Sequence, residues 1–214
     1  DDIKKMDLKI DVVVPVPDSA RDAAIEIARK LKLKYREALV KNRYIGRTFI
    51  MPSDSTRRES VKQKLNPIAS ELKGKNVLLV DDSIVRGSVS EGGSVWVVHN
   101  AGARFLEFWI SYGPMFFPSF KEWQRGRDCL EELAVQRAFE DGNPYDKSVE
   151  EINAAVARLL DVDEVKYNRT ERIEKVAGKG SLQALDASYP ISEAFWPDWL
   201  KKEVERFHRY RTGK

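Results

Sequence analysis

Two adjacent carboxylates, Asp81 and Asp82, directly follow the apolar run Asn76 to Val80. A short run of branched apolar residues is typical of a strand that is buried on both faces of a parallel sheet. In open parallel sheets, ligands bind at the carboxyl ends of the strands, which is where this pair falls. Two neighbouring carboxylates at such a position can bind a diol or a hydrated cation.

The residues after the acidic pair add groups that bind phosphate. The stretch from Ser83 to Ser90 contains Arg86, Gly87 and the hydroxyl of Ser88, and then turns into a predicted helix. Backbone N–H groups at a helix start, together with hydroxyls, can surround a phosphate dianion. Gly87 lets the backbone approach closely, because it lacks a Cβ atom. A bare acidic pair could also be a solvated loop that caps the next helix, but the Gly/Ser turn favours a binding site.

Alternating strands and helices in the first half of the chain would position these groups. We expect strands at Ile10 to Val16, Asn76 to Val80 and Phe105 to Ile110, a short one at Ala38 to Val40, and helices at Ala20 to Leu33 and Ser90 to Ala101. Asp18 and Ser19 offer N-caps for the first helix. Repeated strand–helix–strand units of this kind predict an α/β fold with a parallel sheet.

The second half of the chain is more helical. We expect helices at about Arg127 to Ala138, Ser148 to Leu160 and Trp196 to Tyr210. Ser148 and Glu151 have the spacing of a capping box at the start of the middle helix. The expected organisation is a core over residues 1–125 and a helical part over residues 126–214 that packs on it.

The composition excludes several classes of protein. The 214 residues are 42% hydrophobic and 33% charged, which is ordinary for a globular chain, and the net charge of +3 does not favour a nucleic-acid partner. The single cysteine, Cys129, excludes a disulfide framework and is expected to be a small buried side chain. No apolar run approaches the length of a membrane span. These features favour a cytoplasmic protein.

Residues 41–67 are polar, basic and rich in turn formers, and they make a longer connection than is usual in a compact domain. A stretch of this charge could meet a diphosphate or a nucleic-acid backbone.

Four segments of the chain resemble type I phosphoribosyltransferases and, within that class, glutamine phosphoribosylpyrophosphate amidotransferases. They are Val14 to Ser19, Lys41 to Pro52, Arg57 to Asn66 and Val77 to Ser88. The resemblance is dense from Asp11 to Ala103. It implies a type I phosphoribosyltransferase fold, in which helices flank a central, mostly parallel sheet, with a helical C-terminal extension. It also implies a homo-oligomer.

The resemblance assigns substrate-binding roles for phosphoribosyl pyrophosphate. Asp81 and Asp82 would hold the ribose hydroxyls and Mg²⁺, and Ser19 would lie beside the metal. The ribose and 5-phosphate set is completed by Ser83, Arg86, Gly87, Ser88 and Ser90, and the diphosphate loop holds Asp18 and Ser19.

Residues 41–67 resemble a flexible loop that closes over the substrate, and Tyr44, Arg47 and Lys64 match positions that face its diphosphate. Displacement of diphosphate passes through a cation-like ribose and needs no nucleophilic side chain. Mg²⁺, Arg47 and Lys64 would neutralise the leaving group.

The implied reaction is the transfer of ammonia to phosphoribosyl pyrophosphate, the first step of purine synthesis. In the family a glutaminase domain supplies the ammonia, and this sequence contains none. The chain could be part of a larger assembly, use free ammonia, or have lost the reaction. Two other functions stay open: a non-catalytic sensor of phosphoribosyl pyrophosphate, and a salvage transferase that acts on a base.

Two departures from the family pattern bear on function. Ser181 and Ala184 occupy the places of two cysteines that bind an iron–sulfur cluster in some members, and neither side chain supplies a thiolate, so no cluster is expected. Val89 replaces one hydroxyl residue of the phosphate loop, but the backbone amides of that loop would remain.

Overall fold

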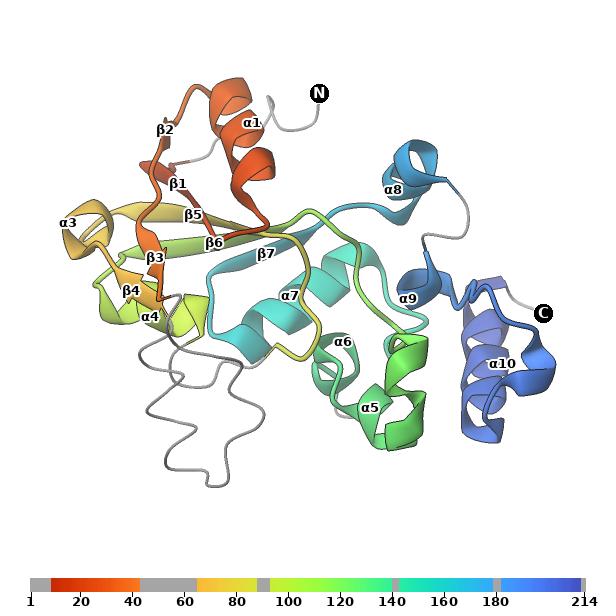
Figure 1. The fold of residues 1–214 in the computed structure, drawn as a ribbon. Coiled ribbons are helices and arrows are strands. Elements are labelled where there is room, and N and C mark those ends of the chain that lie inside the picture. Colours follow the sequence, from red (N-terminus) through yellow and green to blue (C-terminus); the bar gives the residue numbers. More distant parts are fainter. Residues whose placement is uncertain (1–8, 43–64, 88–92, 140–142, 179–181, 213–214) are drawn as a thin grey trace. The chain divides into compact units, whose positions relative to one another are not determined.

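The computed structural model describes residues 9–42, 65–87, 93–139, 143–178 and 182–212 (Figure 1). The chain forms two compact units that alternate along the sequence. The sheet unit comprises residues 1–82, 88–111 and 160–166, and the helical unit comprises residues 83–87, 112–159 and 167–214. The division after residue 125 stays a prediction. No described helix is long and apolar enough to cross a membrane.

Within the described residues, a central sheet of five strands has the order β2-β1-β5-β6-β7. The strands are β1 (Val12–Pro15), β2 (Lys34–Tyr35), β5 (Asn76–Asp81), β6 (Phe105–Ile110) and β7 (Glu164–Tyr167). β1 pairs in parallel with β2 and β5, and β5 pairs in parallel with β6. The expected α/β fold and its three main strands are confirmed. β2 and β7 were not expected.

Helices cover both faces of this sheet (Figure 1). Helix α1 (Arg21–Leu31) packs Ala24 and Ala28 against Val13 and Leu78, and these small side chains let the helix approach the strands closely. Helix α4 (Ser94–Asn100) lies on the opposite face. The expected N-caps of the first helix were wrong: α1 follows Ala20, and no side chain caps it.

A small antiparallel ladder joins the two ends of the segment 43–64. It consists of β3 (Leu39–Lys41) and β4 (Leu65–Pro67), which places Lys41 opposite Leu65. Helix α3 (Ala69–Leu72) follows, and the backbone N–H of Ile68 donates to the carbonyl of Ala38 at 2.8 Å. The residues that precede and follow the segment 43–64 are therefore held next to each other by the pairing of β3 with β4.

The helical unit begins its regular structure with a 3-10 helix. Its elements are η3 (Phe120–Arg125), α5 (Asp128–Glu131), α6 (Ala134–Arg137), α7 (Val149–Leu160), α8 (Thr170–Ala177), α9 (Gln183–Asp186), η4 (Glu193–Phe195) and α10 (Asp198–Thr212). The capping box at Ser148 and Glu151 is confirmed, with the Glu151 N–H donating to the Ser148 hydroxyl at 3.2 Å.

The expected single helix from Arg127 to Ala138 was wrong. Leu133 adopts an extended conformation between α5 and α6, and its side chain is buried. This break directs the N–H of Ala134 to the carbonyl of Val85, at 2.8 Å. A tertiary hydrogen bond and the burial of Leu133 therefore replace one turn of helix.

An aromatic cluster anchors the last helix of the unit. Phe207 of α10 packs against Phe116, Phe117 and Tyr145, with ring centroids 5.2 to 5.6 Å apart. The Tyr145 hydroxyl donates to the buried carboxylate of Glu203 at 2.7 Å. The C-terminal helix is thus packed into the unit. Cys129 is also buried, as expected.

Candidate active site

The carboxyl ends of three neighbouring strands meet at one edge of the sheet unit. The N–H of Val16, just after β1, donates to the carbonyl of Val80 at 2.8 Å. The N–H of Ser111, just after β6, donates to the carbonyl of Asp81 at 3.0 Å. The segment with Asp18 and the acidic pair therefore follow adjacent strands at the same edge, where the ligands of open parallel sheets bind.

The two carboxylates of the acidic pair have different environments. The Asp82 side chain is exposed, whereas Asp81 is largely withdrawn from solvent. The pKa of Asp81 is raised from 3.8 to about 7. Burial is the main cause, the Asp82 N–H, which donates to Asp81 Oδ1 at 2.8 Å, lowers the pKa, and the negative charge of Asp82 raises it. The surroundings of Asp81 therefore disfavour the ionised form of its carboxyl group.

Replacing Asp81 by asparagine should stabilise the unliganded protein. The carboxyl ionises near pH 4 in the unfolded chain but at about 7 in the fold, so it destabilises the fold increasingly between these values and fully above them. Asparagine keeps the acceptor for the Asp82 N–H without the charge. We expect a gain of roughly 1–3 kcal/mol at pH 8, or several degrees in Tm, that disappears near pH 4.

Thermal unfolding at pH 4, 6 and 8 measures this difference, and Asp82→Asn is the matched control because its side chain is exposed. If Asp81→Asn were no more stable than Asp82→Asn at pH 8, the account of the Asp81 environment would be wrong.

An ionised pair of this kind fits a divalent cation. Among the described residues, no group of three or more His, Cys, Asp or Glu side chains is placed to hold a metal ion alone. Mg²⁺ is commonly bound through one or two carboxylates, with water and substrate oxygens completing its octahedral shell. Asp81 and Asp82 could therefore share a Mg²⁺ ion with a bound phosphate ester.

The segment after β1 is joined to the ladder by an ion pair. The carboxylate of Asp18 accepts from Lys41 Nζ at 3.1 Å, and Arg21 of α1 lies 3.7 Å away. The Pro17–Asp18 peptide bond is cis, and the side chains of Asp18 and Ser19 are exposed. Lys41 thus ties the base of the segment 43–64 to the predicted diphosphate loop.

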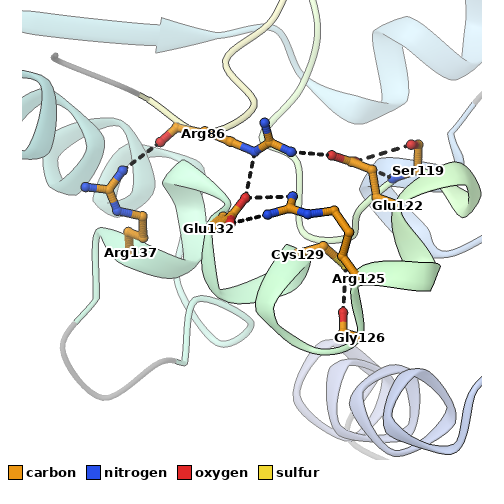
Figure 2. Close-up of polar contacts among 8 residues, drawn as sticks. All are labelled: Arg86, Ser119, Glu122, Arg125, Gly126, Cys129, Glu132 and Arg137. Carbon is orange, nitrogen blue, oxygen red and sulfur yellow. Dashed lines mark hydrogen bonds and ion pairs between the residues drawn. The ribbon is translucent and has the colours of Figure 1, made fainter. Parts of the chain in front are cut away.

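The segment that follows the acidic pair belongs to the helical unit. Ile84 is buried, and Gly87 has a φ of 53°, a conformation that favours glycine. The carboxylates of Glu122 and Glu132 flank the Arg86 guanidinium (Figure 2). Neither glutamate was expected from the sequence, although the Ser119 to Glu122 spacing of a capping box could have indicated the first.

Several predicted site residues lie outside the described residues. They are Tyr44, Arg47, Lys64, Ser88 and Ser90. Ser181, at one of the two positions where some relatives have cysteine, lies outside them as well. At the other, Ala184 is buried and its carbonyl accepts from the N–H groups of Phe116 and Phe117. The roles of these residues, and the expectation of no iron–sulfur cluster, stay predictions.

Comparison with solved structures shows which class of proteins shares this fold. No family model matches the sequence. The structure resembles that of glutamine phosphoribosylpyrophosphate (PRPP) amidotransferase from B. subtilis complexed with ADP and GMP, with a TM-score of 0.63, 33% identity, and coverage of 92% of this chain and 41% of that chain. The fold is that of a phosphoribosyltransferase.

Sequence relatives show to which family within this class the chain belongs. It is 57% identical to the amidophosphoribosyltransferase of Haemophilus influenzae over 95% of its own length, and 40% identical to that of Methanothermobacter thermautotrophicus over 84%. It belongs to the amidophosphoribosyltransferases and is their phosphoribosyltransferase-like part. The chain spans 37% and 35% of the lengths of these two relatives.

Proposed function

We propose that this chain transfers ammonia to phosphoribosyl pyrophosphate, which gives 5-phosphoribosylamine and diphosphate, the first step of purine synthesis. The observation that carries the proposal is the 57% identity to an amidophosphoribosyltransferase over 95% of the chain. The position of the acidic pair at the carboxyl end of β5 supports it, because the ligands of open parallel sheets bind there.

The substrate would be held from both of its charged ends. Asp81 and Asp82 would accept hydrogen bonds from the ribose hydroxyls, and the backbone around Gly87, with Ser83, Ser88 and Ser90, would bind the 5-phosphate. Asp18 and Ser19, after the neighbouring strand β1, would face the diphosphate. Burial of Asp81 supports this assignment, since a group with a raised pKa in a ligand-binding position is a common mark of a functional site.

The reaction would be a displacement at C1 of the ribose. The ammonia nitrogen forms a bond to C1, the bond from C1 to the diphosphate oxygen breaks with its electron pair, and the nitrogen loses a proton to solvent. Arg47 and Lys64, with Tyr44, would stabilise the charge on the departing diphosphate. Ser19, Asp81 and Asp82 would hold Mg²⁺, which would supply further neutralisation of the diphosphate charge.

The ammonia would come from a glutaminase domain or subunit, or directly from solution. The chain spans 37% and 35% of the lengths of the two relatives named above, which leaves room for a glutaminase part in proteins of this family. We further propose a homo-oligomer in the cytoplasm, a compartment that suits a chain with one cysteine.

An acceptor panel tests the proposal. The purified chain is incubated with phosphoribosyl pyrophosphate, Mg²⁺ and, in separate reactions, ammonium, glutamine or a purine base, and diphosphate release is measured. We expect release with ammonium and none above background with the bases. Release with a base would indicate a salvage transferase, and Mg²⁺-dependent binding without any release would indicate a sensor.

A further inference from the structure

The guanidinium of Arg86 lies between two carboxylates of the helical unit (Figure 2). Its Nη2 donates to Glu122 Oε1 at 2.7 Å, and its Nε lies 2.8 Å from Glu132 Oε2. Nε and Nη2 of the guanidinium, which lie along one edge of it, are therefore both paired with carboxylates. A phosphate that bound the guanidinium through the same edge would have to displace one or both carboxylates.

Each of these carboxylates is itself fixed by a second contact. The other oxygen of Glu122 accepts from the N–H and the hydroxyl of Ser119, in the capping box at the start of η3. Glu132 accepts from both terminal nitrogens of Arg125, which, together with Arg86, hold the pKa of Glu132 below its ordinary value. Each of the two carboxylates is thus held by a contact with a residue other than Arg86.

The backbone on either side of the Arg86 side chain is held as well. Arg137 Nη1 donates to the carbonyl of Arg86 at 2.8 Å, and the N–H of Ala134 donates to the carbonyl of Val85 at 2.8 Å. Because Leu133 is extended, α6 starts at the place where its first N–H can make this bond. Groups from η3, from α6 and from Glu132, which directly follows α5, therefore converge on residues 85–86.

We propose that Arg86 is a positioning residue, which fixes the backbone of the phosphate-binding segment through Glu122 and Glu132, and that it does not bind the 5-phosphate itself. The inference rests on the proposed function. A single exposed ion pair contributes little to stability. Here several contacts act on one short segment: two bonds from Arg86, the bidentate pair of Arg125 with Glu132, and the bonds to the backbone carbonyls of residues 85 and 86. Holding the segment in its bound conformation would lower the entropic cost of phosphate binding.

The double variant Glu122→Gln/Glu132→Gln separates this role from direct phosphate binding. Glutamine keeps the capping box and nearly the same volume but removes both charges. If Arg86 positions the segment, the KM for phosphoribosyl pyrophosphate should rise about 10-fold, with kcat in the ammonium reaction changed by less than about 2-fold. If Arg86 binds the phosphate, the variant frees it, and KM should stay the same or fall. That result would overturn the proposal.

Glu131→Gln is the matched control, because it removes a neighbouring charge that pairs with Arg127 on the surface and does not contact Arg86. It should leave KM unchanged. Arg86→Lys should raise KM as the double variant does, since an ammonium lacks the planar fork that reaches two carboxylates. Adding Arg86→Lys to the double variant should raise KM no further.

Hydrogen exchange at the Ala134 amide gives a readout that does not depend on turnover. This amide bonds to the Val85 carbonyl, and it should exchange about 10-fold faster in the double variant than in Glu131→Gln. Unchanged exchange would contradict the positioning role. If the unmodified chain released no diphosphate, the proposed function would fail, while the exchange result would still decide whether the network holds the segment.

Discussion

Asp82→Asn is expected to weaken the Mg²⁺-dependent binding of phosphoribosyl pyrophosphate about 100-fold. The carboxylate lies exposed at the carboxyl end of β5, beside the less accessible Asp81. We assign it hydrogen bonds to the ribose hydroxyls and part of the charge that holds Mg²⁺. Charge-assisted hydrogen bonds contribute about 1.5–3 kcal/mol each, and a 100-fold change is about 2.7 kcal/mol, so the loss of one such bond accounts for a change of this size.

Titration calorimetry with and without Mg²⁺ measures this effect. Glu26→Gln is the matched control, because Glu26 is an exposed carboxylate of α1 that pairs with Arg29. It should bind as the unmodified chain does. Because Asp82 is exposed, its variant should also keep the Tm of the unmodified protein, which separates lost binding from lost folding. Unchanged affinity in Asp82→Asn would show that the ribose lies elsewhere.

The double variant Arg47→Ala/Lys64→Ala should lower kcat for ammonium-dependent diphosphate release by about 10³-fold. Both residues are assigned to the departing diphosphate, whose charge grows as the bond to C1 breaks. Removal of one preorganised group that stabilises such charge typically costs about 10²–10³ in kcat. The effect on KM should be much smaller, because the interaction strengthens in the transition state.

Steady-state kinetics over a range of phosphoribosyl pyrophosphate concentrations measures kcat and KM separately. Arg29→Ala removes a cation from the exposed surface of α1 and should keep the normal kcat. A rise in KM with an unchanged kcat would mean that Arg47 and Lys64 only bind the substrate. That outcome would contradict the proposed role of Arg47 and Lys64 in stabilising the transition state.

The strands that carry the site could be predicted because their sequences are mostly apolar. β5 and β6 begin at the expected residues, and β1 lies within the expected range. β2 and β7 could not be found this way: β2 has two residues, and β7 alternates polar and apolar positions. The break at Leu133 depends on the distant carbonyl of Val85, which no local pattern reveals.

For the candidate site, the local features were predictable. The acidic pair at the end of β5 and the turn at Gly87 leave signals in the local sequence, while the binding roles of these residues stay predictions. The partners of Arg86 were missed, since Glu122 is 36 residues away and its contact arises only when the helical unit folds. The raised pKa of Asp81 was missed for the same reason, as burial depends on the packed structure.

The initial rate of ammonium-dependent diphosphate release, measured with saturating phosphoribosyl pyrophosphate and Mg²⁺ at mildly alkaline pH, decides whether this chain transfers ammonia to phosphoribosyl pyrophosphate. We expect the rate to rise with ammonium and to saturate, each diphosphate to be matched by one 5-phosphoribosylamine, and chelation of Mg²⁺ to abolish the release. Tight Mg²⁺-dependent binding of the substrate, with a rate that does not respond to ammonium, would show that the chain does not catalyse this transfer.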